Sequence, residues 1–153
     1  MVNIDKRTKE IGIEIPELVK PKYLYVPAKI SGKLIYVSGQ LPYKNGELLY
    51  KGKLDESITL EEGFKAAELA TLNCISAMKF VVGDLNKVKE IIKLNGFVSS
   101  SNGFDKQALV IDKASNLLIE LWGESGKHAR KAIGVSELPG GSVLEIELIA
   151  SLF

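Results

Sequence analysis

The first fifty residues show short runs of alternating apolar and polar side chains. Residues 3–13 space apolar and charged positions as a helix does, and Pro16 and Pro21 lie beyond its expected end. The alternating runs and the turn residues between them predict three strands, at 23–30, 34–38 and 47–50. The pattern therefore indicates a peripheral segment, residues 1–20, followed by an antiparallel meander.

The period then changes from two to between three and four. Thr59 with Glu62 three residues later has the form of a capping box, which predicts the start of a helix. Its apolar stripe continues to Gly83 and consists of Phe64, Ala67, Thr71, Cys74, Met78 and Val81. Because Cys74 lies on this stripe, it is interpreted as a buried structural thiol rather than a nucleophile.

A strand and a second helix follow. Residues 88–98 form a run suited to a strand, and the polar residues 99–103 form a loop. Residues 105–121 again show helical periodicity, which ends at Gly123. The alternation of helix and strand continues as far as the last two strands of the chain.

Residues 127–150 carry charges on two strongly apolar strands. Arg130 lies on the first, a Pro-Gly-Gly turn at 139–141 follows, and Glu145 and Glu147 lie on the second. We expect a hairpin that brings Arg130 and Glu147 toward the same end of a sheet. Buried unpaired charges cost several kcal/mol, so these charges form a structural ion pair or line a cavity. Glu145 has no assigned role.

The order of elements predicts one α+β domain, residues 1–153. A split β-α-β core with two long helices on one face of a mostly antiparallel sheet accounts for it. The other face of such a sheet needs a partner, so we expect an oligomer.

Composition excludes several classes of protein. The net charge is +1, from 20 basic and 19 acidic residues, so there is no electrostatic footprint for nucleic acid. One cysteine excludes a disulfide framework and a thiolate metal site. No apolar run approaches the roughly 20 residues that a membrane span needs. The charged N-terminus does not resemble a signal peptide, so the expected location is cytoplasmic.

Two sequence blocks carry a family resemblance. The first is Tyr25 followed, after twelve residues, by SGQLP at 38–42, and the second is HARKAIGVSELPGG with EIELIA. In this order and spacing the chain resembles the Rid/YjgF family, also called the YER057c-like or endoribonuclease L-PSP family, from about residue 20 onward. The segment NGFVSSSNGFDKQALVIDKASNLLIELWG is typical of a branch distinct from the RidA deaminases. The resemblance implies a chorismate-mutase-like fold and a homotrimer whose three sheets form an inner barrel.

The same resemblance implies a site. Arg130 matches the arginine that grips the carboxylate of a 2-imino or 2-enamino acid, a task suited to a planar guanidinium. Glu147 is matched to the glutamate that orients or activates water. Tyr25 lines the pocket beside Ser38 and Gly39, where a missing Cβ admits a ligand to the backbone. This chemistry requires no metal or cofactor.

Two positions depart from the deaminase pattern. Ala132 replaces the usual cysteine, and Lys113 falls where those enzymes have asparagine. His128, the only histidine, lies at the pocket mouth or on the surface. These three residues are possible outer members of the site, and they allow a different substrate.

Two functions of different classes therefore remain. The chain is an imine or enamine hydrolase, or it binds a small carboxylate metabolite without catalysis. An endoribonuclease is less well supported, because one histidine and no basic groove do not supply the usual acid–base pair. The expected partners are a small carboxylate and further copies of the chain, and neither nucleic acid nor a membrane.

Overall fold

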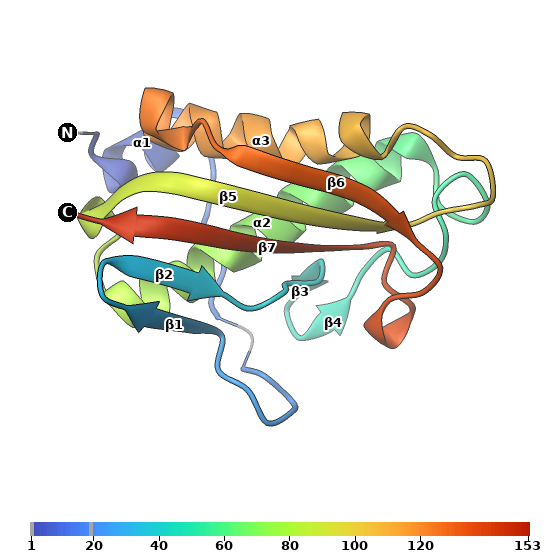
Figure 1. Ribbon diagram of the computed structural model, residues 1–153, viewed down its shortest axis with the longest axis horizontal. Helices are drawn as coiled ribbons and strands as arrows, with labels where there is room; N and C mark the ends of the chain where they lie inside the picture. The colour runs from blue at the N-terminus through green and yellow to red at the C-terminus, as the bar shows by residue number, and fades with distance from the viewer. Residues whose placement is uncertain (1, 19) are drawn as a thin grey trace.

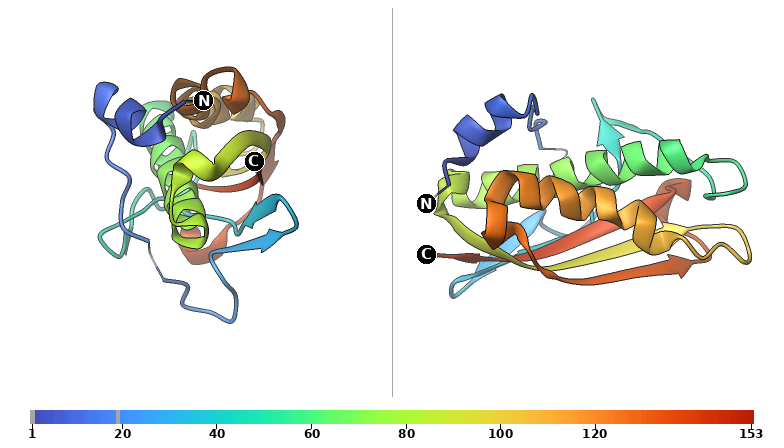
Figure 2. Two further views of the ribbon diagram at one scale, coloured as in Figure 1. Left: turned by 90° about the vertical axis from the view of Figure 1, so that its left-hand side faces the viewer. Right: turned by 90° about the horizontal axis from the view of Figure 1, so that it is seen from above.

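The computed structural model describes residues 2–18 and 20–153. Two long helices, α2 (Leu60–Val82) and α3 (Gln107–Trp122), lie side by side on one face of a five-stranded sheet (Figures 1 and 2). The short helix α1 (Ile4–Glu10) packs beside the end of α3, where the Arg7 Nε–H donates to the Glu120 carbonyl at 2.7 Å. The expected layering of helices on one sheet face is confirmed.

The sheet has the order β1-β2-β7-β5-β6. Its strands are β1 (Ala28–Ser31), β2 (Leu34–Val37), β5 (Val88–Ser99), β6 (Ala129–Val135) and β7 (Leu144–Leu152). All neighbours are antiparallel except β5 and β6, which are parallel. A separate two-stranded ribbon joins β3 (Tyr43–Lys44) and β4 (Glu47–Leu48), and three short 3-10 turns complete the elements, at Leu85–Lys87, Gly123–Gly126 and Pro139–Gly141.

The predicted terminal hairpin is wrong. β5 lies between β6 and β7, pairing with β6 in parallel and with β7 in antiparallel register (Figure 1). The physical reason is the β5–α3–β6 crossover, which returns a strand parallel to the one it left. β7 then occupies the place between β5 and β2. Alternation predicts each strand but not its partner.

The predicted strand at 23–30 is also shorter than expected, because only its end enters β1. Residues 23–26 form a projecting loop in which Tyr23 is 79% exposed and Leu24 fully so. β-Propensity without a neighbouring strand does not make a strand.

The helix prediction from 59 to 83 is confirmed in detail. The Thr59 side chain accepts from the Glu62 N–H, and Glu62 accepts from the Thr59 N–H, completing the capping box. α2 ends at Gly83, which has a φ of 76°. Such a positive φ is readily adopted only by glycine.

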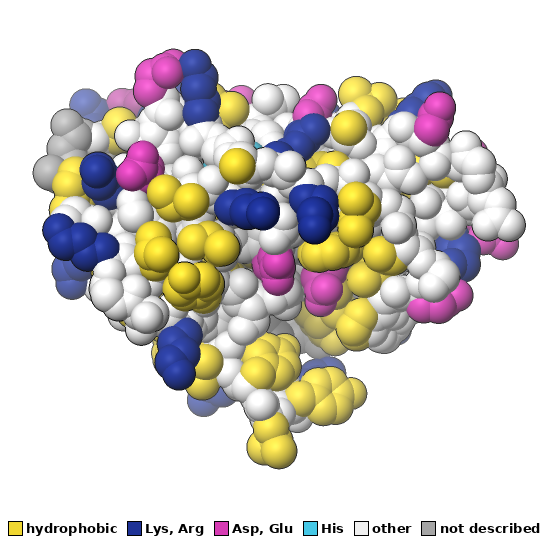
Figure 3. Space-filling model, in the orientation of Figure 1, with side chains coloured by type: hydrophobic (Ala, Val, Ile, Leu, Met, Phe, Trp, Pro, Cys, Tyr) yellow, Lys and Arg dark blue, Asp and Glu magenta, His cyan; other side chains and the backbone are white. Residues whose placement is uncertain are grey.

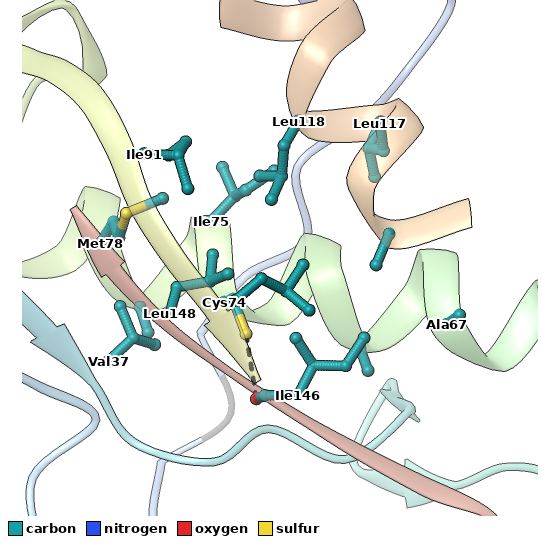
Figure 4. Packing of buried hydrophobic residues seen from close by; sticks show 14 of the residues in the cluster. Val37, Ala67, Cys74, Ile75, Met78, Ile91, Leu117, Leu118, Ile146 and Leu148 are labelled. Carbon is teal, nitrogen blue, oxygen red and sulfur yellow. Dashed lines mark hydrogen bonds between the residues drawn. The ribbon is translucent and has the colours of Figure 1, made fainter. Parts of the chain in front are cut away.

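Cys74 is buried in the core between α2 and the sheet (Figure 4). Its Sγ donates to the Ile146 carbonyl at 3.3 Å, and burial raises the pKa of the thiol well above its usual value. A buried, protonated thiol is a poor nucleophile, so its interpretation as a structural residue is confirmed.

Replacing Cys74 by alanine should therefore affect stability and not function. We expect Cys74→Ala to lower the free energy of unfolding by about 1–2 kcal/mol, through lost packing. Urea unfolding of the variant and the parent measures this. Loss of ligand binding or activity in a folded variant would contradict a purely structural role.

Candidate functional site

A cavity of about 540 Å³ opens at the end of β2, beside β7. Three parts of the chain line it. These are residues of segment 20–25, residues of segment 38–43, and three residues near the start of β7, namely Pro139, Gly140 and Glu145. Three of the predicted residues, Tyr25, Ser38 and Gly39, lie here. The structure thus brings together the tyrosine and the Ser-Gly pair, which are thirteen residues apart in the sequence.

Local hydrogen bonds hold these segments in place. The Ser38 hydroxyl donates to the Val26 carbonyl at 2.6 Å, and the Ser38 N–H donates to the Pro27 carbonyl at 2.9 Å. Beyond β2, Gln40 exchanges two backbone hydrogen bonds with Ile146 of β7, at 2.7 and 3.0 Å. The Ser38 hydroxyl is thus occupied in fixing the loop, and Gly39 is held against β7.

Gly39 lies directly against the Glu145 side chain. A Cβ at Gly39 would lie 2.7 Å from both Cδ and Oε1 of Glu145, closer than non-bonded atoms allow. Glycine at this position therefore lets the Glu145 carboxyl lie between β7 and the Ser38-Gly39 segment. The carboxyl is half-buried, and its pKa is raised by burial and then by the nearby charge of Glu147. A carboxyl that holds its proton to higher pH is suited to acid–base chemistry.

Glu145 lines the cavity, although the sequence pattern assigns it no role. Alternation places it on the same face of β7 as Glu147, because side chains two apart share a face. Which of the two reaches the cavity depends on the path of residues 38–40, and that path is a tertiary feature.

Glu147 lies outside the cavity lining, two residues along β7 on the open face of the sheet. Its Oε1 accepts a hydrogen bond from Nδ2 of Asn95 at 2.7 Å, and Asn95 is its direct neighbour on β5. Two acidic side chains are visible near the middle of this face, over β7 (Figure 3). The role of Glu147 in orienting or activating water stays a prediction. Its carboxylate is hydrogen-bonded to the Asn95 amide.

Arg130 points to the other side of the sheet, toward α3. Its Nη1 donates to Oδ1 of Asp112 at 2.6 Å and to Oγ of Ser115 at 3.3 Å. Within the chain, Arg130 and Glu147 therefore form neither an ion pair nor a common pocket. The expected proximity of these two residues rested on the hairpin, and β5 separates them.

The three outer residues also lie on or near the helix side. His128 Nδ1–H donates to the Gly126 carbonyl at 2.6 Å, so Nε2 accepts from the Ser115 hydroxyl at 3.0 Å. Burial lowers the pKa of His128, opposed by the Gly126 hydrogen bond and assisted by Arg130. The Lys113 ammonium lies 5.0 Å from the centre of the Phe64 ring, between α3 and α2, and Ala132 lies opposite Gly96 on β5. None of the three lines the cavity.

The cavity also contains groups that were not predicted. Lys20, Lys22 and Tyr43 lie in its wall, and the Lys22 ammonium is 5.6 Å from the centre of the Tyr43 ring. Within residues 2–18 and 20–153, no cluster of three or more histidine, cysteine, aspartate or glutamate side chains is suited to hold a metal. In the same part of the chain, no helix has the length and apolar character of a membrane span.

The fold and this cavity define a class, the α+β proteins of chorismate-mutase-like architecture. Residues 5–152 match the model of the family described as "YjgF/chorismate mutase-like, putative endoribonuclease". The chain therefore belongs to the YjgF family, as the two sequence blocks had indicated.

Similar proteins come from protozoa and bacteria. Protein TCP17 of Trypanosoma cruzi is 39% identical over 145 residues, covering 94% of this chain and 91% of that protein. Atu1372 of Agrobacterium tumefaciens, a protein of unknown function, is 41% identical with a TM-score of 0.90, covering 98% and 92% of the two chains. A putative endoribonuclease of Shewanella oneidensis MR-1 is 35% identical with a TM-score of 0.94, covering 98% and 99%.

RidA of an Antarctic Psychrobacter shares the fold at a greater distance. It is 24% identical with a TM-score of 0.62, covering 89% of this chain and 94% of that one. At this identity the comparison shows a common fold.

Proposed function

We propose that the protein hydrolyses reactive 2-imino or 2-enamino acids to 2-keto acids and ammonia. The observation that carries this proposal is the half-buried carboxyl of Glu145, which lines a cavity of about 540 Å³ and has a raised pKa. Membership of a family that includes RidA proteins supports the same reaction class. Imine hydrolysis makes few demands, because it needs a positioned water and one group that transfers protons.

Glu145 performs the proton transfers in this proposal. Its ionised form accepts a proton as the water oxygen bonds to C2 of the imine, and the resulting carboxylic acid returns that proton to nitrogen. In the resulting carbinolamine, Glu145 takes the hydroxyl proton and delivers it to nitrogen as the C2–N bond breaks, so that ammonia leaves and the water oxygen becomes the 2-keto oxygen. Gly39 leaves room for the carboxyl, and Tyr25 and Tyr43 flank the substrate in the cavity wall.

The substrate carboxylate needs a cation. Lys20 and Lys22 line the cavity in the same subunit, whereas Arg130 reaches such a cavity only in another copy of the chain. We include Arg130 of a neighbouring subunit in the site. Asp112 and Ser115 bind its Nη1 and the Ala108 carbonyl accepts from Nη2 at 3.4 Å, whereas Nε–H has no hydrogen-bond partner among the described residues. Nε–H and the second N–H of Nη2 suit a bidentate contact to a carboxylate.

The assembly that we propose for this site is a homotrimer with the open sheet face turned inward. Apolar side chains exposed on this face and on the projecting loop favour the assembly, among them Tyr23, Leu24, Val26, Tyr36 and Ile133 (Figure 3). Light scattering coupled to size exclusion should show three times the 16.7 kDa chain mass. A stable monomer would contradict the trimer and remove Arg130 from the site.

A direct assay tests the proposed reaction. The protein is added to 2-iminopropionate generated in situ, and the release of ammonia and pyruvate is followed against the spontaneous rate. We expect a rate that rises in proportion to protein concentration. A rate equal to the spontaneous one, with several imino acids, would contradict the hydrolase.

Binding of a small carboxylate without catalysis is the second candidate. It is favoured by Lys20 and Lys22 in the cavity wall, which supply cations for a carboxylate whether or not Glu145 transfers protons. Calorimetric binding of 2-keto acids without turnover of their imines would identify this function. Ribonuclease activity has less support, because His128 is bound to Gly126 and Ser115 and does not line the cavity.

A further inference from the structure

Two carboxyl groups with different surroundings lie next to each other on β7. Glu145 and Glu147 share the open face of the sheet, since the intervening Ile146 is fully buried against the helices. Glu145 lies against Gly39 in the cavity, whereas Glu147 accepts the hydrogen bond of Asn95. The pKa of Glu145 is raised by burial and then by the charge of Glu147, so the position of Glu147 affects the protonation of Glu145.

The Asn95 amide has a defined orientation. Its Nδ2 donates to Glu147 Oε1 at 2.7 Å, while its Oδ1 is buried and has no hydrogen-bond partner among the described residues. Rotating the amide by 180° would direct its oxygen at the carboxylate and lose this bond. A buried acceptor without a partner costs free energy. The hydrogen bond that Asn95 donates to Glu147 offsets this cost and keeps the amide in its observed orientation. This hydrogen bond fixes the Glu147 carboxylate in place on the open face of the sheet.

Other titratable groups around the pair come from the neighbouring strands, the N-terminal segment and α2. Lys131 of β6 lies beside Asn95, and Lys93 lies two residues before it on β5. Lys20 and Lys22 reach the cavity from the N-terminal segment, together with Tyr23, Tyr25 and Tyr43. Under the sheet, Cys74 of α2 is buried and protonated. Among the charged groups of the described residues, Glu147 is the one that affects the pKa of Glu145.

We propose that Glu147 and Asn95 act as a positioning pair for Glu145, in which the Asn95 amide holds the Glu147 carboxylate beside Glu145 on the open face of the sheet and Glu147 thereby controls proton transfer by Glu145. The inference rests on the proposed role of Glu145 in proton transfer. Glu147 is then a positioning residue that acts through Glu145 and does not touch the substrate.

Charge and burial support the same assignment. The pKa of Glu145 is raised first by burial and second by Glu147. Removing the charge of Glu147 removes only the second cause. The group should then release its proton at lower pH than in the parent protein, but still at higher pH than an exposed glutamate.

The test is a carboxyl titration that needs no turnover. Glutamate labelled with ¹³C at Cδ is followed by NMR from low to neutral pH, and Glu145→Gln identifies the Glu145 signal. In Glu147→Gln we expect the Glu145 midpoint to fall, and in Glu56→Gln, which removes an exposed loop carboxylate, we expect no change. Asn95→Ala should also lower the Glu145 midpoint, and it provides a second variant if Glu147→Gln does not fold.

The pH profile of turnover is the second measurement. In Glu147→Gln the profile of kcat/KM should move toward lower pH, in the direction of the NMR midpoint. An unchanged Glu145 midpoint in folded Glu147→Gln and Asn95→Ala would overturn the inference. A shifted midpoint without any imine hydrolysis would leave the pair in place and reject the proposed function instead, so the two failures are distinguishable.

Discussion

Glu145→Gln is expected to reduce kcat/KM for imine hydrolysis by roughly 10²–10⁴-fold, the usual contribution of a general acid–base group. Glutamine has nearly the same shape and keeps a hydrogen-bonding oxygen beside Gly39, but it cannot take a proton from water. The fold should persist, because the carboxyl contributes no ion pair among the described residues. The measurement is steady-state hydrolysis of in situ generated imines, with circular dichroism to verify folding.

The matched control is Glu56→Gln, which makes the same chemical change at an exposed loop residue. It should retain the activity of the parent protein. Full activity in folded Glu145→Gln would mean that the cavity is a binding site or that another group transfers the proton.

Arg130→Lys should weaken the binding of small 2-keto acids by about 2–4 kcal/mol, or roughly thirty- to a thousandfold in affinity. A single ammonium cannot replace the two parallel hydrogen bonds of a guanidinium. The stability of the fold should change little, because the pair with Asp112 is partly exposed, and exposed ion pairs contribute little. Calorimetric titration of pyruvate and 2-ketobutyrate measures the difference.

Arg7→Lys is the control, since Arg7 is the only other arginine of the chain and lies on α1. It should bind as the parent does. Equal affinities in all three proteins would show that Arg130 is structural, held by Asp112 and Ser115 to join β6 to α3. The carboxylate contact would then fall to Lys20 and Lys22.

The regular elements could be predicted from the sequence because their signals are local. The capping box of Thr59 and Glu62 and the apolar stripe through Cys74 lie within a few residues of one another, and they predict the start of α2 and its buried face. The motif order from Tyr25 to the end of β7 likewise indicated the family and its fold.

Strand pairing could not be predicted in this way. The alternating residues around Arg130 and Glu147 predict two strands, but a hairpin and a crossover have the same alternation. Packing of α3 onto the sheet places β6 beside β5 in parallel, and β7 then takes the central position. Residues 23–26 give a second example. Their side chains favour a strand, but they form a loop because no neighbouring strand pairs with them.

For the candidate site, too, some features follow from the sequence and others only from the tertiary structure. By itself the sequence determined that Tyr25, Ser38 and Gly39 belong to one pocket and that two glutamates share one face of the last strand. Only the tertiary structure decided that Glu145 enters the cavity, that Asn95 binds Glu147, and that Arg130 turns toward α3. Alternation determines the face of a side chain, whereas its neighbours depend on contacts between segments far apart in the chain.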